Sequence, residues 1–245
     1  MILAYIILFT FIGSIGSLAG SYFLLFKRKI TEAFAGILIA FAAGALLATA
    51  FLDLFPEALE EANDANIFVP ALLGFLSFFI AERYIRLFHY HHGHGEKPST
   101  LLVLIGDGIH NFVDGVTIAV AFLNSIPLGI TTSIAVAAHE IPQEIADMGV
   151  LLANGLSKTR AVIFNFLSAL TALAGALIAF AAATLIENYL YFFLALAAGH
   201  FTYIAASDLI PEIHEDGNKR RGVQTLIFFA LGILTVYIFT IIFEG

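Results

Sequence analysis

The chain has 245 residues, of which 60% are hydrophobic and 12% charged, and its net charge is −8. Because a soluble domain carries about 25% charged residues, this composition excludes an ordinary water-soluble globule and indicates a protein embedded in lipid. Cysteine is absent, which excludes a disulfide framework and any thiolate metal site.

Long apolar runs follow one another along the chain, separated by short turns. A bilayer core requires about 20 mostly apolar residues per helix. Runs of that length predict eight transmembrane helices, near residues 2–26, 34–59, 66–88, 100–124, 128–152, 158–184, 189–211 and 222–243. We therefore expect an all-α integral membrane protein in which residues 1–245 form a single domain.

The basic residues lie at alternate turns of this arrangement. All Lys and Arg residues lie at or after the ends of the first, third, fifth and seventh predicted helices: Lys27, Arg28, Lys29, Arg83, Arg86, Lys97, Lys158, Arg160, Lys219, Arg220 and Arg221. Since cytoplasmic loops are enriched in Lys and Arg, these turns are predicted to be cytosolic and both termini to lie outside the cytosol.

A short motif repeats near the ends of the second and seventh predicted helices, as DLFPE at residues 53–57 and DLIPE at 208–212. These helices run in opposite directions across the bilayer. The repeat therefore predicts inverted halves, helices 1–3 and 6–8, around helices 4 and 5, which is a recurring transporter architecture. It puts Asp53 and Glu57 near the outer mouth, and Asp208 and Glu212 near the inner mouth.

The fourth and fifth predicted helices carry polar residues at mid-membrane depth. Residues four apart share one face of a helix. This spacing pairs His110 with Asp114, His139 with Gln143, and Glu140 with Glu144, and Asp147 lies one turn beyond. Each ionised group facing lipid would cost about 2.5–3.5 kcal/mol, and no Lys or Arg lies at that depth to pair with these acids. They need a bound cation or protons, and imidazole with carboxylate and amide oxygens suits a divalent ion such as Zn²⁺.

Other polar residues are less specific. The predicted cytosolic loop 89–99 contains four histidines that can bind metal ions, His89, His91, His92 and His94. His200 and Asn165 are isolated within apolar helices, and the sequence leaves each open between a metal ligand and a hydrogen-bonded packing residue.

The motifs HNFVDG at residues 110–115 and HEIPQE at 139–144 resemble the two signature helices of the ZIP (Zrt/Irt-like protein) family of metal transporters. Residues 198–203 (AGHFTY) and the DLIPE motif after them also resemble this family, and the resemblance covers nearly the whole chain. It implies uptake of zinc, or of iron, manganese, cobalt or cadmium, into the cytosol across the plasma membrane. The implied partners are divalent metal ions, the lipid bilayer and a second copy in a homodimer, with no nucleic acid.

The resemblance also implies a two-metal site between the fourth and fifth helices, which would move like an elevator against a scaffold containing the second and seventh. Gln143 stands where many members have His or Glu. One metal would be bound by His110, Asp114 and Gln143. The second would be bound by Asn111, Asp114, His139, Glu140 and Gln143, with Glu144 and Asp147 in the same polar core.

Three other functions remain open from the residues alone. His139 and Glu140 begin the H-E-x-x-H pattern of an intramembrane zinc metalloprotease, but residue 143 is Gln, so the second zinc His is missing and we expect no enzyme. A membrane metal sensor would bind the ion without moving it. A proton- or sodium-coupled carrier of an organic solute would use the acids as proton relays.

Overall fold

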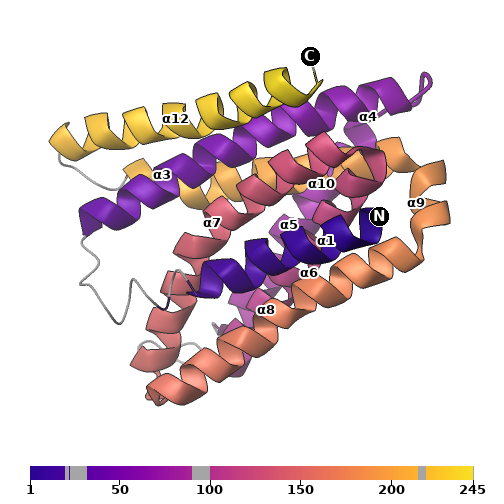
Figure 1. Ribbon diagram of the computed structural model, residues 1–245. Helices are drawn as coiled ribbons and strands as arrows, with labels where there is room; N and C mark the ends of the chain where they lie inside the picture. Colours follow the sequence, from indigo (N-terminus) through magenta and orange to yellow (C-terminus); the bar gives the residue numbers. More distant parts are fainter. Residues whose placement is uncertain (20–21, 23–31, 90–99, 215–218, 245) are drawn as a thin grey trace.

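The computed structural model describes residues 1–19, 22, 32–89, 100–214 and 219–244. Within these ranges the regular structure is helical and no strand occurs, so the predicted all-α class is confirmed there. Both chain termini lie at the end of the bundle that also holds α4 (Phe55–Glu61) and α9 (Ala183–Asn188) (Figure 1).

Each predicted apolar run coincides with helical structure where the chain is described. The longer α-helices are α1 (Ile2–Phe11), α3 (Glu32–Ala48), α5 (Phe68–His89), α6 (Thr100–Asn124), α7 (Ile126–Ala153), α8 (Lys158–Ala181), α10 (Leu190–Tyr203) and α12 (Lys219–Glu244). In the described part of the chain, π-helical segments continue α1, α3 and α10, namely η1 (Ile12–Gly16), η2 (Thr49–Leu54) and η3 (Ile204–Leu209). The last two lead into α4 and α11 (Ile210–His214).

Five helical stretches of the described residues are long and apolar enough to cross a membrane: Ile2–Ala19, Gly36–Glu61, Lys158–Ala181, Leu190–His214 and Gly222–Ile242. α6 and α7, which have 25 and 28 residues, carry the polar cluster and are not among them. The predicted number of eight crossings therefore stays a prediction.

The segments η2 and η3 occupy equivalent places in the repeated motif. They end two residues before Pro56 and Pro211, respectively. Proline has no N–H and its ring clashes with the carbonyl group four residues earlier. A widened π-helical turn relieves that clash without ending the helix, and such turns are frequent at functional sites.

Several helix pairs of the described chain, among them α3 with α12 and α5 with α10, approach so closely that only glycine fits where they cross. A Cβ atom on Gly44 of α3 would lie 2.1 Å from the carbonyl oxygen of Phe229 in α12. A Cβ atom on Gly199 of α10 would lie 2.0 Å from the carbonyl oxygen of Ala71 in α5. Close backbone contact at small residues is typical of helices that associate in lipid, where no hydrophobic force drives packing.

α6 and α7 pack against each other, and other helices cover them. α8 and α1 contact α6, while α3 and α12 contact α7 (Figure 1). Gly115 allows the close approach of α6 to α8, since a Cβ atom there would lie 1.8 Å from the carbonyl oxygen of Ala172. The polar faces of α6 and α7 are thereby buried within the protein.

Candidate metal centre

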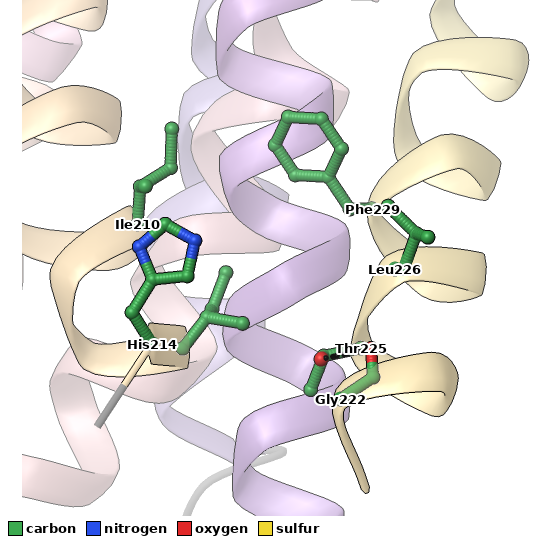
Figure 2. Close-up of a pocket in the computed structure, with 7 residues that line it drawn as sticks. Ile210, His214, Gly222, Thr225, Leu226 and Phe229 are labelled. Atoms are coloured by element: carbon green, nitrogen blue, oxygen red, sulfur yellow. Dashed lines mark hydrogen bonds between the residues drawn. The ribbon is translucent and has the colours of Figure 1, made fainter. Parts of the chain in front are cut away.

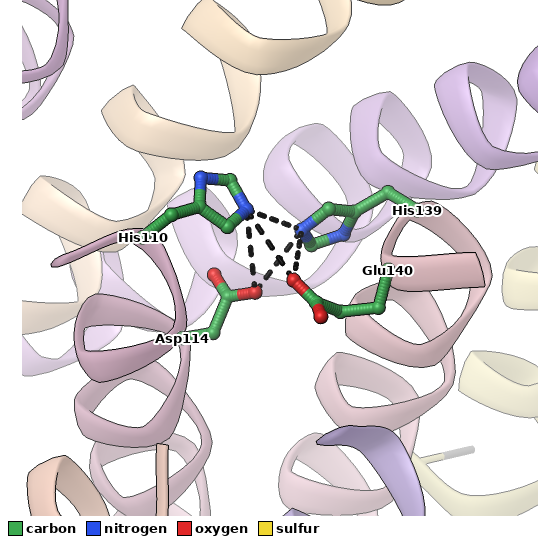
Figure 3. Close-up of side chains that lie close together, drawn as sticks. All are labelled: His110, Asp114, His139 and Glu140. Atoms are coloured by element: carbon green, nitrogen blue, oxygen red, sulfur yellow. Dashed lines mark hydrogen bonds and ion pairs between the residues drawn. The ribbon is translucent and has the colours of Figure 1, made fainter. Parts of the chain in front are cut away.

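Two histidines and two carboxylates converge between α6 and α7 (Figure 3). His110 and Asp114 come from α6, and His139 and Glu140 come from α7. One ligand atom of each lies within 4.8 Å of the other three. All four residues are buried, with at most 7% of their surface exposed. We call this group the four-residue cluster.

The distances within the four-residue cluster suit a tetrahedral ion. His110 Nε2 lies 3.1 Å from His139 Nε2, 3.6 Å from Asp114 Oδ2 and 3.5 Å from Glu140 Oε1. His139 Nε2 lies 3.0 Å from Asp114 Oδ2 and 3.9 Å from Glu140 Oε1. Ligand atoms about 2.0–2.1 Å from a tetrahedral Zn²⁺ are separated by about 3.3–3.4 Å. The observed separations bracket this value, so small side-chain shifts would suffice to bind the ion.

The protonation pattern favours a cation at the centre of the cluster. His139 Nδ1 lies 3.1 Å from the carbonyl oxygen of Ala135, which can only accept a hydrogen bond. The neutral ring therefore carries its proton on Nδ1 and turns the lone pair of Nε2 toward the cluster. Asp114 Oδ2 and both carboxylate oxygens of Glu140 are buried without a hydrogen-bond partner. Buried acceptors of this kind are costly unless a cation or a proton compensates them.

Two further predicted site residues make their hydrogen bonds outside the four-residue cluster. Asn111 donates to Asp107 Oδ1 at 2.9 Å, and its own oxygen lies 3.4 Å from the hydroxyl oxygen of Ser14, which donates to the carbonyl oxygen of Ala169 at 2.7 Å. Glu144 is fully buried and accepts a hydrogen bond from Asn165 of α8. Asn165, which the sequence left unassigned, is therefore the partner of a buried carboxylate. Ser14 carried no sequence signal, because its contact with Asn111 spans 97 residues.

The remaining predicted residues of the site line a cavity of about 710 Å³ that reaches the four-residue cluster at His110. Its polar lining residues include Ser77, Asp107, Gln143, Asp147, His200, Asp208 and Glu212. The structure thus brings Gln143 and Asp147 together with the two predicted inner-mouth acids in one space. His200 also belongs to this space.

The two predicted outer-mouth acids do not line that cavity. Asp53 is fully buried and accepts a hydrogen bond from Thr240 at 2.6 Å. Glu57 accepts one from Asn124 at 2.9 Å. Neither Thr240 nor Asn124 was identified from the sequence, because both contacts join residues far apart in the chain.

A second cavity, of about 370 Å³, lies between α11 and α12 (Figure 2). Its lining is mostly aliphatic and aromatic, and His214 is the only metal-ligating side chain among the residues that line it, all of which the structure describes. It therefore does not resemble the four-residue cluster. Of the His-rich loop, His89 ends α5, whereas His91, His92 and His94 lie outside the described residues.

Comparison with known proteins decides the family. The sequence model of the family described as "ZIP Zinc transporter" matches residues 2–100 and 89–240, which is nearly the whole chain. The chain belongs to the ZIP family. ZIP proteins are multi-pass membrane transporters and not enzymes, so the expectation that this chain is not an enzyme is confirmed and the protease alternative is excluded.

Curated ZIP proteins are similar over about half of the chain. Zinc transporter ZIP10 of Homo sapiens is 43% identical over 138 residues, which cover 54% of this chain and 17% of that protein. Zinc transporter ZIP6 of Homo sapiens is 39% identical over 129 residues, covering 52% and 17%. Zinc transporter ZIP4 of Mus musculus is 40% identical over 126 residues, covering 51% and 19%. The match thus spans less than a fifth of each of these longer proteins.

Proposed function

We propose that this ZIP protein transports zinc, or a related divalent cation such as iron, manganese, cobalt or cadmium, into the cytosol through the four-residue cluster. The observation that carries the proposal is the convergence of two imidazole nitrogens and two carboxylate oxygens in a buried site, where each nitrogen lies 3.0–3.9 Å from the other three atoms. Such a mixed nitrogen and oxygen set suits a borderline ion, and zinc is named for the similar curated proteins.

A second metal position is part of the proposal. The family resemblance assigns it to Asn111 and Gln143 together with cluster residues. Asn111 would bind the ion through its Oδ1, which lies 3.4 Å from Ser14 Oγ, while its Nδ2 keeps its hydrogen bond to Asp107. Glu144 and Asp147, which belong to the same polar core, would supply further carboxylate oxygens to a second cation.

The direction of transport rests on the charge distribution. α8 and α12 begin with Lys158 and Lys219 at the end of the bundle opposite to the termini (Figure 1). We assign that end to the cytosol by the positive-inside rule. The cavity that contains Asp208 and Glu212 then leads from the cluster toward the cytosol. Asp53 and Glu57 attract the ion on the other side, and the loop histidines at positions 89, 91, 92 and 94 receive it inside.

The proposed architecture has eight crossings with an inverted repeat. α6 and α7 are long enough for two of them, since about 1.5 Å per residue gives more than the roughly 30 Å of a bilayer core. The repeat is supported by two features that recur at an offset of 155 residues, the π-helical turns η2 and η3 and the packed glycines Gly44 and Gly199. A homodimer in the plasma membrane and an elevator-like movement of α6 and α7 complete the proposal.

Transport is tested by reconstituting the purified chain into liposomes and measuring entry of Zn²⁺, Mn²⁺, Fe²⁺ and Cd²⁺ in competition. Saturable uptake is expected for the wild type and for the control Gln224→Ala, which changes an exposed residue of α12. It should be lost in a His110→Ala, Glu140→Ala double variant. Metal binding without uptake by the wild type would instead identify a sensor, and uptake retained by the double variant would remove the cluster from the pathway.

A further inference from the structure

His200 of α10 is a buried histidine outside the four-residue cluster, and one of its two ring nitrogens has no partner. The residue is 6% exposed, and its Nδ1 is buried without a hydrogen-bond partner. Its other nitrogen, Nε2, lies 3.0 Å from the hydroxyl oxygen of Ser77 in α5. The two ring nitrogens are therefore in different situations, one bonded and one unpaired.

The hydroxyl group of Ser77 decides which nitrogen of His200 carries the proton. Ser77 Oγ donates its single proton to the carbonyl oxygen of Gly74 at 2.9 Å. The contact with His200 must then be donated by Nε2–H, since a serine hydroxyl has only one hydrogen. In the neutral ring, Nδ1 consequently has a free lone pair. A histidine that donates from one nitrogen and offers the other is the usual form of a metal ligand.

The surroundings of His200 supply the other requirements of a cation position. His200 lines the 710 Å³ cavity together with Asp147, Asp208 and Glu212, so one imidazole and three carboxyl side chains border the same space. The ring of Phe78 contacts both His110 and His200, with ring centroids 5.2 Å and 5.3 Å apart. One aromatic ring thus lies between an imidazole of the four-residue cluster and the imidazole of His200.

We propose that His200 Nδ1 is a ligand of a separate cation position in this cavity, which takes a borderline divalent ion with imidazole, carboxylate and water ligands. The inference rests on the proposed transport function and extends it. An ion that leaves the cluster past Phe78 is received by His200 before it reaches Asp208 and Glu212. His200 comes from α10, and it belongs to neither of the two metal positions expected between α6 and α7.

The test counts Cd²⁺ ions bound to the full-length chain in detergent by equilibrium dialysis. The background carries Ser at the loop histidines 89, 91, 92 and 94, so that the loop contributes no ligand. His110→Ala and His139→Ala then disable the cluster. This variant should still bind one Cd²⁺ per chain, and adding His200→Ala should abolish that binding. The matched control adds His214→Ala instead, which leaves the bound ion in place.

A second variant separates ligation from folding. Ser77→Ala keeps the imidazole but removes the group that fixes its tautomer, so the affinity for this Cd²⁺ should fall about 10–100-fold. Equal Cd²⁺ binding with and without His200, or no binding once the cluster is disabled, would overturn the proposal. This experiment measures Cd²⁺ binding in detergent and not transport, so Cd²⁺ can bind at His200 even if the liposomes show no uptake. Conversely, the liposomes can show uptake even if no Cd²⁺ binds at His200.

Discussion

The Nδ1 atom of His139 lies 3.1 Å from the carbonyl oxygen of Ala135, one turn earlier on α7. The orientation of this ligand is therefore set within a single helix rather than by a neighbouring one. Pro142, three residues later, deprives the carbonyl group of Ala138 of its usual backbone partner. Helix α7 thus combines a ligand of fixed orientation with a carbonyl group that lacks its usual i+4 backbone donor.

The first prediction concerns His139. Replacing it with Ala removes one of the four ligands of the cluster. Loss of a residue that only hydrogen-bonds to a metal ligand lowers metal affinity about 10–100-fold, so loss of the ligand itself should lower the affinity for Zn²⁺ by more than that. Titration calorimetry on purified protein with the loop histidines replaced measures this affinity. The control His214→Ala, which changes the cavity between α11 and α12, should bind Zn²⁺ as the parent does. An affinity for His139→Ala within tenfold of the parent would mean that zinc binds elsewhere.

The second prediction concerns the hydrogen bond between Asn165 and Glu144. Asn165→Ala leaves a buried carboxylate without its donor, which should lower the free energy of unfolding by about 1–3 kcal/mol. Thermal denaturation in detergent reports this change, with the exposed Gln224→Ala as control. In a double-mutant cycle with Glu144→Gln, the two effects should couple by at least about 0.5 kcal/mol, whereas additive effects would show that the contact is energetically unimportant.

The third prediction concerns the crossing of α6 and α8 at Gly115. Because a Cβ atom there would lie 1.8 Å from a backbone oxygen, Gly115→Ala must push the helices apart. We expect a loss of about 1–3 kcal/mol in the free energy of unfolding, together with weaker metal binding, since Asp114 is adjacent. Gly222→Ala is the matched control, because no heavy atom lies within 4 Å of a Cβ atom there. Similar melting temperatures for both variants would contradict the close packing of α6 and α8.

The sequence could predict what depends on one helix or on two neighbours in the chain. The spacing of His110 and Asp114 put both on one face, and the short turn after Asn124 made α6 and α7 partners, so the ligands of the cluster could be anticipated. The partners of Asn111 could not, because η1 supplies Ser14 from 97 residues away. Likewise the role of Asn165 depends on how α8 is rotated, and the apolar surroundings of that residue leave the rotation undetermined.

The π-helical turns and the tautomer of His200 also could not be predicted from the sequence. The repeated DLFPE and DLIPE motifs indicated related helix ends, but a proline is compatible with a kink, a break or a widened turn. The proton on His200 depends on Ser77 and on the carbonyl group of Gly74, which α5 brings to α10 only in the folded bundle.

The last prediction concerns membrane topology, which the absence of Cys makes directly testable. Any introduced cysteine is the only thiol of the chain. Glu61→Cys and Asn188→Cys lie at exposed positions at the ends of α4 and α9, near the end of the bundle that holds the termini. In intact cells an impermeant maleimide should label both of them.

Lys158→Cys and Lys219→Cys, at the starts of α8 and α12, should react only after the membrane is permeabilised. This pattern would put the cavity of Asp208 and Glu212 on the cytosolic side and support uptake. Labelling of all four sites in intact cells would contradict the arrangement of eight crossings. The reversed pattern would keep the fold but turn the cavity outward, so that an ion entering there would meet His200 before the four-residue cluster.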